Sequence, residues 1–502
     1  MHTIDSHIDS MGMRLKPSKC RTFSLKSGRP SRVDFNIKNE RIANLFEEEQ
    51  KFLGKVIFPS GKSSETFQHV KDIFAEKLEN IDKSSIRNEY KLWIYDNYFL
   101  SAHRFLLTIH TLTATDLKKL DTFTDQYVKK WAGVPKCTTN SLIHMRTGLD
   151  IKSITEMYEE AHMVSHTRTR LKGDSKVNHV LDCTVERESQ FVRKKSITVS
   201  SENTFQRAMR MTTVGGDRPM FGENWEHQEK EFEEAVKDQV KVALRVEQQE
   251  EHLTKVQTLA KQGDFLYMAS CEGGDAIWKS FIYNLKQGTM KFYLNAVTNT
   301  LPTGNNLLQW GKSTNDQCKL CKGRETTCHV LNNCKVALDQ GKYTWRHDNI
   351  LSYIATILDH TKYRCYVDIP NHMTTTGGTI PVELCVTPLR PDIVIVDDKK
   401  KTMDIFELTC PLEPNIKKRH TEKSDKYAHF NGDLDQHTTK VTCFEMGSSG
   451  CISPDNHKRL KSLHKFCKPN TKLSIYSSYA IFIARKEPQW MKPGTMKPPF
   501  SE

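Results

Sequence analysis

The sequence predicts an α+β protein of several domains, and three observations support this fold class. The chain has 502 residues, which is enough for roughly three domains. Strand patterns occur near both ends, in residues 1–60 and 361–487, whereas residues 61–193 follow a helical periodicity. A compact group of cysteine and histidine in residues 301–360 predicts a small metal-bound module between them.

Residues 1–60 contain short alternating stretches that predict strands. No core-forming segment precedes these strands, so we expect the end of a domain whose beginning is absent. Residues 61–193 predict a series of helices, and Gly133 with Pro135 is expected to end one of them.

Three basic residues in the helical block are candidates for nucleic-acid binding. Arg168, Arg170 and Lys172 alternate with short polar residues, a pattern that suits phosphate contacts in a loop or strand. A solvated basic surface explains these three residues equally well.

Residues 194–300 combine a predicted linker with one long helix. Periodicity is lost over 194–225, where Gly, Ser, Thr and Arg are frequent, and residues 226–262 then follow an amphipathic helical pattern. We assign this helix no chemistry, because most such apolar stripes pack in a core.

The cysteine and histidine group has the spacing of a zinc knuckle. Cys318, Cys321, His329 and Cys334 are separated by two, seven and four residues. Three thiolates and one imidazole form the tetrahedral ligand set that Zn²⁺ prefers, in a segment too short for a core of its own. Cys328 precedes His329, so a four-cysteine site is the alternative.

The C-terminal block, residues 361–487, predicts a small mixed sheet flanked by helices. Its clearest element is a hairpin of strands at 393–396 and 403–409, separated by polar residues. Further strands are expected at 379–386 and 472–487. Two other segments complete the prediction: a strand end, glycine loop and basic helix over 444–466, and a disordered tail over 488–502.

An acid occupies a defined place on each strand of the hairpin. Asp392 opens the first strand, while Glu407 shares its face of the second strand with Met403 and Ile405. Asp404 lies on the opposite face. After the hairpin, a predicted helix places a stripe of four residues on one side, namely Ile416, His420, Lys423 and Tyr427.

Two carboxylates and a lysine in this arrangement suit metal-dependent phosphodiester cleavage. Asp392 and Glu407 can hold Mg²⁺, which activates water and shields the phosphate. Lys423 can stabilise the developing negative charge or orient the water, and its presence in an apolar stripe suggests an anionic neighbour. An ordinary hairpin with solvated charges is the alternative interpretation.

Composition favours a polyanionic partner. The formal net charge is +13, and lysine and arginine occur along the whole chain, which favours nucleic acid over an acidic small molecule. No apolar run reaches the ~18 residues of a membrane span, and the first residues lack the core of a signal peptide. We therefore expect no membrane partner and interpret the fourteen cysteines as thiols or metal ligands.

Two family resemblances follow from these motifs. The pair Asp392 and Glu407, with fourteen residues between them, resembles the PD-(D/E)xK nuclease core. The simple motif has lysine where this chain has Thr409, and in several branches of that superfamily the lysine lies on the following helix. The resemblance therefore implies a catalytic role for Lys423, with Lys426 as the second choice.

The order of segments resembles the C-terminal part of a non-LTR retrotransposon reverse transcriptase of the rDNA-inserting type. Residues 12–19 and 51–54 are similar to its last palm motifs, and residues 61–193 to its thumb. The LPT segment at 299–310, the zinc knuckle and the RHD segment at 346–348 follow in the same order, ahead of the restriction-like endonuclease.

This resemblance implies a nuclear protein that nicks target DNA and primes reverse transcription of element RNA. The paired polymerase aspartates do not occur in the sequence, so we expect a truncated polyprotein without polymerase activity of its own. A catalytically dead nucleic-acid-binding remnant is the alternative, and a decayed copy without a cellular role is a third possibility.

Overall fold

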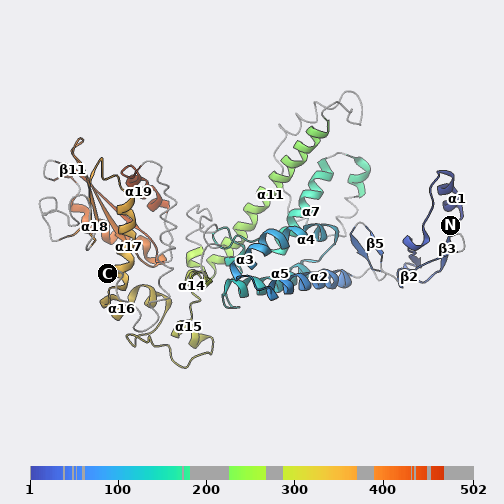
Figure 1. Ribbon diagram of the computed structural model, residues 1–502, viewed down its shortest axis with the longest axis horizontal. Coiled ribbons are helices and arrows are strands. Elements are labelled where there is room, and N and C mark those ends of the chain that lie inside the picture. The colour runs from blue at the N-terminus through green and yellow to red at the C-terminus, as the bar shows by residue number, and fades with distance from the viewer. Residues whose placement is uncertain are drawn as a thin grey trace. The chain divides into compact units, whose positions relative to one another are not determined.

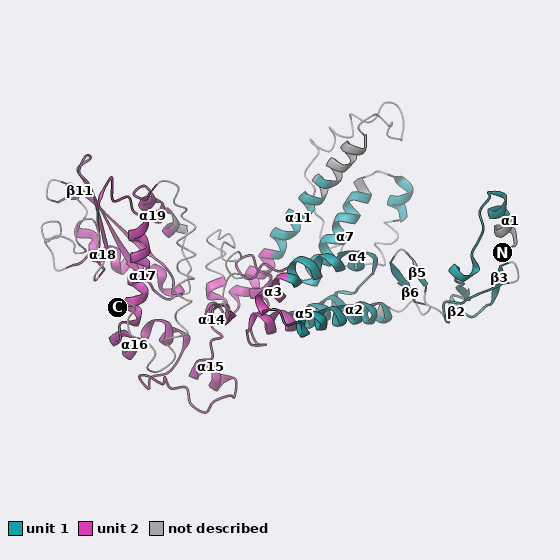
Figure 2. Cartoon of the chain, viewed as in Figure 1, with its two compact units in different colours: residues 1–85, 94–124, 152–248 teal, residues 86–93, 125–151, 249–502 magenta. Residues whose placement is uncertain are grey.

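The chain is described from a computed structural model (Figure 1). The structure describes residues 2–37, 40–47, 50–52, 54–58, 63–171, 174–180, 225–266, 287–369, 389–430, 432–434, 437–448 and 454–468. The chain forms two compact units (Figure 2): unit 1 holds residues 1–85, 94–124 and 152–248, and unit 2 holds residues 86–93, 125–151 and 249–502.

Unit 1 begins with helix α1 (His2–Ser10), followed by three small antiparallel sheets of two strands each. The strand pairs are β1 (Ser24–Lys26) with β2 (Arg29–Ser31), β3 (Phe35–Ile37) with β4 (Glu40–Ile42), and β5 (Gln50–Phe52) with β6 (Lys55–Ile57). Ser27 and Gly28, which join the first pair, both have positive φ, as a tight two-residue hairpin turn requires. The strands expected in residues 1–60 are confirmed, whereas α1 was not anticipated.

Helices form the described part of residues 61–193, as the periodicity predicts. They are α2 (Ser63–Lys83), α3 (Asn88–Ile94), the π-helix η2 (Tyr95–Phe99), α4 (Leu100–Ile109), α5 (Ala114–Ala132), α6 (Ser141–His144) and α7 (Ile154–Leu171). Gly133 has φ +71° and its N–H bonds the Lys130 carbonyl at 3.2 Å, so α5 ends where the sequence indicated. The long helix is also confirmed, as α11 (Trp225–Gln257). The predicted linker at 194–225 lies almost wholly outside the described residues.

The loop or strand expected around the basic residues is wrong for two of the three. Arg168 and Arg170 lie on α7, which continues to Leu171, instead of in a loop or strand. Lys172 lies outside the described residues.

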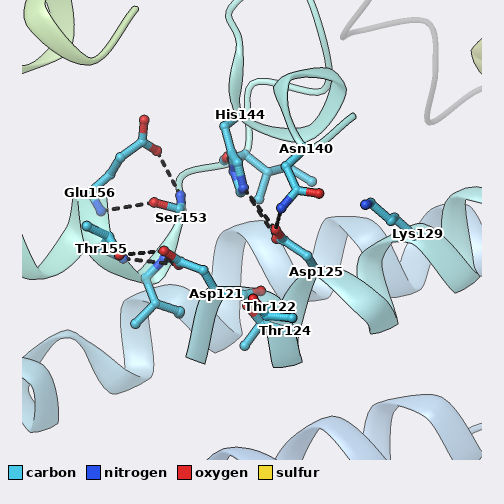
Figure 3. A network of polar contacts seen from close by, with 12 residues as sticks. Asp121, Thr122, Thr124, Asp125, Lys129, Asn140, His144, Ser153, Thr155 and Glu156 are labelled. Carbon is cyan, nitrogen blue, oxygen red and sulfur yellow. Dashed lines mark hydrogen bonds and ion pairs between the residues drawn. The ribbon is translucent and has the colours of Figure 1, made fainter. Parts of the chain in front are cut away.

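Polar side chains organise the ends of the helices in this region (Figure 3). Ser153 and Glu156 form a reciprocal capping box: the Ser153 N–H donates to the Glu156 carboxylate at 2.8 Å, and the Glu156 N–H donates to Ser153 Oγ at 3.0 Å. Asp121 accepts the first free N–H of α7 at 2.7 Å. Asp125 accepts a bond from Asn140 at 2.6 Å. These contacts give the acids Asp121, Asp125 and Glu156 structural roles.

Unit 2 contains a five-stranded mixed sheet in the order β10-β11-β9-β8-β7. Its strands are β7 (Arg364–Val367), β8 (Ile393–Asp397), β9 (Thr402–Thr409), β10 (Gly432–Leu434) and β11 (His437–Glu445). Strands β9 and β11 run parallel, and the other neighbouring pairs are antiparallel. The predicted hairpin is therefore confirmed as β8 and β9, and β11 supplies the strand end expected at 444.

Within residues 287–468, helices precede the sheet, follow β9 and follow β11. They are α14 (Gln287–Val297), α15 (Gly304–Gln309), the π-helix η3 (His329–Asn333), α16 (Lys335–Asp339), α17 (Lys342–Ile357), the 3₁₀ helices η5 (Glu413–Asn415) and η6 (Ala428–Phe430), α18 (Ile416–Tyr427) and α19 (Pro454–His464). Helices α18 and α19 confirm the two predicted in this block. Among the described helices, none has the length and apolar character needed to cross a membrane.

Two apolar clusters cover the two faces of the sheet. On one face α17 and α19 pack through Leu351, Ile354, Leu460 and Leu463 against Ile393, Ile395, Phe406, Leu408 and Phe444. On the other face Tyr427 of α18 and Phe430 pack against Val394, Val396, Met403 and Ile405. Strand alternation produces this division, and Glu407 belongs to the second face.

Two parts of the predicted block differ from expectation or lie outside the structure. The strand beside β8 is β7 (Arg364–Val367), which the sequence did not predict. The strands expected at 379–386 and 472–487, and the tail at 488–502, lie outside the described residues.

Candidate metal centres

Four potential metal ligands converge in residues 318–334. One ligand atom from each of Cys318, Cys321, His329 and Cys334 lies within 4.8 Å of all the others. Cys321 Sγ and His329 Nε2 are 3.2 Å apart. Within the described part of the chain, this is the one group of three or more such ligands.

The geometry of the cluster fits Zn²⁺. Zn–S bonds of ~2.3 Å in a tetrahedron place sulfur atoms about 3.8 Å apart, so small side-chain adjustments bring all four atoms to a single ion. Cys328 is not a member of the group, and its Sγ accepts a bond from Asn333 Nδ2 at 3.3 Å. Of the two ligand sets that the sequence allowed, the structure favours the one with His329.

Backbone and tyrosine contacts hold the ligands in place. The Cys318 N–H bonds the Gly323 carbonyl at 2.6 Å, closing a tight turn in which Lys322 has φ +61°. Tyr343 of α17 donates its hydroxyl to the His329 carbonyl at 3.1 Å and accepts the Cys334 N–H at 3.0 Å. Tyr343 of α17 therefore holds the turn that carries His329 and Cys334 through two hydrogen bonds.

The two acids of the hairpin meet at one end of β8 and β9. The register pairs Ile393 with Phe406, so Asp392 and Glu407 face each other across the two strands. The Asp392 N–H donates to Glu407 Oε2 at 3.3 Å, and the Asp392 carboxylate accepts the Leu408 N–H at 2.6 Å. Both acids are largely buried, with 8% and 2% of their surface exposed.

Lys423 of α18 reaches this pair and donates to Glu407 Oε1. Burial and the neighbouring negative charge of Asp392 raise the pKa of Glu407, while Lys423 opposes the shift. A bound cation would stabilise the ionised form of two carboxylates that repel each other in this way. The structure thus brings together Asp392, Glu407 and Lys423 as the sequence suggested.

A histidine and a third acid join the centre, and the sequence reasoning missed them. His347 of α17 places Nε2 3.3 Å from Asp392 Oδ2 and Nδ1 3.2 Å from Asp348 Oδ1. Burial lowers the pKa of His347, but its bonds to Asp348 and Asp392 outweigh burial and raise the pKa to about 11. His347 and Asp348 belong to the RHD segment at 346–348. In the sequence this segment indicated only the order of segments in the family, and not a role in the acid centre.

The arginine of the same segment connects the two centres. Arg346 is 3% exposed and donates to the Leu331 carbonyl at 2.9 Å, within the zinc-ligand turn, and to the Cys410 carbonyl at 3.4 Å, just after β9. Asn332 also donates to the Cys410 carbonyl, at 2.9 Å. Helix α17 therefore contacts the knuckle through Tyr343 and Arg346, and the acid pair through the next residue.

Two further predicted residues, Lys426 and Arg168, are also described. Lys426 is exposed, and its ammonium lies 5.3 Å from the centre of the Tyr427 ring. In unit 1, Arg168 lines a hollow of about 560 Å³ together with Arg104 and Lys237. That basic surface is compatible with phosphate contacts and with solvated charge.

Comparison with known families places the knuckle in context. Residues 267–340 match the family described as zinc-binding in reverse transcriptase, and all four ligands lie inside the match. The match links the chain to reverse-transcriptase-related retroelement sequences and supports Zn²⁺ as the metal of the Cys₃His group. The search of curated proteins returned no match.

Proposed function

We propose that the chain acts in a retroelement as a Mg²⁺-dependent DNA endonuclease, whose catalytic centre lies at the end of β8 and β9. The nick that it makes in nuclear target DNA exposes a 3′-hydroxyl, from which a polymerase copies element RNA. No polymerase activity is proposed for this chain. The observation that carries the proposal is the contact of Asp392, Glu407 and Lys423 from three separate elements.

Each side chain of this centre has a separate role. Asp392 and Glu407 are the ligands for Mg²⁺, an ion that proteins commonly hold with one or two carboxylates plus substrate phosphate and water. When bound, Mg²⁺ supplies a water of lowered pKa and shields the phosphate. Lys423 places a positive charge where the negative charge of the transition state develops. His347 orients the Asp392 carboxylate, as partners of metal ligands generally do.

Plasmid nicking tests the proposal. Purified protein in Mg²⁺ should convert supercoiled DNA to the nicked form, and Asp392→Ala should lower the rate on the order of 10³-fold, because a catalytic metal is worth several kcal/mol. Asp404→Asn is the matched control, since Asp404 is a buried acid of β9, the strand that carries Glu407, and pairs with Lys465 at 3.2 Å on the other face of the sheet. Equal nicking by wild type and Asp392→Ala rejects the assignment.

A nucleic-acid-binding protein without nuclease activity is the second candidate. Thr409 stands where the simple motif has its lysine, and this observation favours the second candidate. It predicts a salt-dependent gel shift with DNA or RNA, and no cleavage with any divalent metal. Cleavage that depends on Asp392 rules it out.

A further inference from the structure

We propose that the hollow between α18, β11 and α19 binds the phosphodiester backbone of DNA. The hollow has a volume of about 400 Å³. Four basic side chains line it, namely His420, Lys440, Lys458 and Arg459, and no carboxylate is among its lining residues. Three hydroxyl groups, from Ser424, Thr442 and Ser462, complete its polar wall. Cations and hydroxyls together are the groups that contact phosphate oxygens in DNA complexes.

A buried acid fixes two of the basic side chains in place. Glu445 is 0% exposed, accepts a bond from His420 Nδ1 at 2.8 Å, and pairs with Arg459 at 3.3 Å. The Glu445 N–H bonds the Asn456 side chain at 3.0 Å, so the backbone that carries the acid is also held. A buried carboxylate is tolerated when it is paired and hydrogen-bonded, and here the pairing orients His420 and Arg459 at the wall of the hollow.

The two lysines of the hollow are exposed to a ligand. Lys440 is exposed, and the Lys458 side chain is 79% exposed, with Asp455 of the same helix 3.6 Å away. The hollow thus combines two basic side chains held by Glu445 with two exposed lysines. An extended polyanion can contact both pairs at once, whereas a single small anion needs only one.

The hollow adjoins the acid pair, and this position identifies the ligand. Ser424 directly follows Lys423 on α18, and Cys443, which lines the hollow, pairs in register with Glu407. Neighbouring strands are about 4.8 Å apart, and each strand of DNA has one phosphate per ~3.4 Å of helix axis. A DNA strand at the acids therefore has further phosphates within reach of the hollow. The choice of DNA rests on the proposed function, whereas the choice of a phosphodiester chain does not.

Charge removal tests the hollow directly. In the Asp392→Ala background, which prevents cutting, Lys440→Ala with Lys458→Ala should weaken binding of a short DNA duplex about 5- to 10-fold. The slope of log affinity against log salt should fall by about 1 to 2, because each phosphate contact contributes ~0.9. Lys399→Ala with Lys461→Ala is the matched control: both lysines are exposed and neither lines the hollow, so binding should change less than twofold.

The outcomes separate this inference from the proposed nuclease. One outcome is that the wild type does not cut DNA while the Lys440→Ala, Lys458→Ala variant still binds DNA more weakly than the control variant. That result supports the hollow as a phosphodiester site and refutes the nuclease. If wild type cuts DNA and both lysine pairs weaken binding equally, the hollow is refuted while the nuclease stands. If the Lys440→Ala, Lys458→Ala variant loses affinity for RNA but not for DNA, the assignment of DNA as the ligand is refuted.

Discussion

The two candidate metal centres of unit 2 are built in opposite ways. All four zinc ligands come from residues 318–334, and the small buried cluster around them adds only Ala337 to the ligands Cys318 and Cys334. The acid centre draws Asp392, Glu407, Lys423 and His347 from separate elements of a sheet domain with two apolar clusters. A local site depends on its metal for order, whereas a site assembled by a sheet has its geometry before the metal binds.

Zinc removal should give the largest effect, and it should act on one centre only. Structural zinc sites contribute ~10–16 kcal/mol shared by four ligands, so Cys318→Ser should weaken zinc binding roughly 10²- to 10³-fold. Hydrogen exchange should then rise in residues 318–341, which lose their order, and stay slow in β8 and β9. Chelation of zinc from the wild type is the control without a mutation. Equal loss of protection in the sheet contradicts the contrast between the two centres.

The same contrast explains how much of each centre the sequence could predict. Spacing predicts the zinc site, because a short segment brings its ligands together whatever the rest of the chain does, but it left His329 and Cys328 as alternatives for one ligand. The pairing of Asp392 with Glu407 was predictable because a hairpin of alternating strands determines its own register. The helical stripe likewise placed Lys423 on the side of α18 that faces the acids.

Contacts between distant elements were not predictable from pattern. His347 reaches Asp392 because α17 packs on the sheet through residues such as Leu351 and Ile354, and nothing in the helical periodicity says which strand end the helix meets. Strand β7 was missed for a related reason, since four residues give too short an alternation to recognise. Arg168 and Arg170 show the converse error, in which alternation within a helix suggested an extended segment.

His347 provides the next test, because it is the member of the acid centre that is most distant in sequence from the two acids. His347→Ala should lower nicking about 10- to 100-fold, the usual cost of losing a partner of a metal ligand. The loss should lessen at high Mg²⁺ concentration, because the role of His347 is to hold Asp392 ready for the ion. His347→Asn, whose amide can still donate to Asp392, should recover part of the rate.

The Mg²⁺ dependence separates this role from a merely structural one. A variant that only destabilises the fold loses activity equally at all Mg²⁺ concentrations, and a thermal unfolding curve detects it. His464→Ala serves as the matched control, since His464 is an exposed histidine at the end of α19. If His347→Ala behaves like this control, the assignment of His347 to the centre is wrong.

Cys328 should show the smallest effect, and it tests how local the zinc centre is. Cys328 directly precedes His329, so sequence spacing allows it as a ligand, yet the π-helix η3 that begins at His329 sets the two side chains apart. Cys328→Ser should therefore change zinc affinity less than about twofold, against the roughly 10²- to 10³-fold loss in Cys318→Ser. A competition assay with a chromogenic chelator measures both variants side by side. If Cys328→Ser loses zinc as readily as Cys318→Ser, the four-cysteine set is the correct one. The placement of Cys328 outside the ligand group is then wrong.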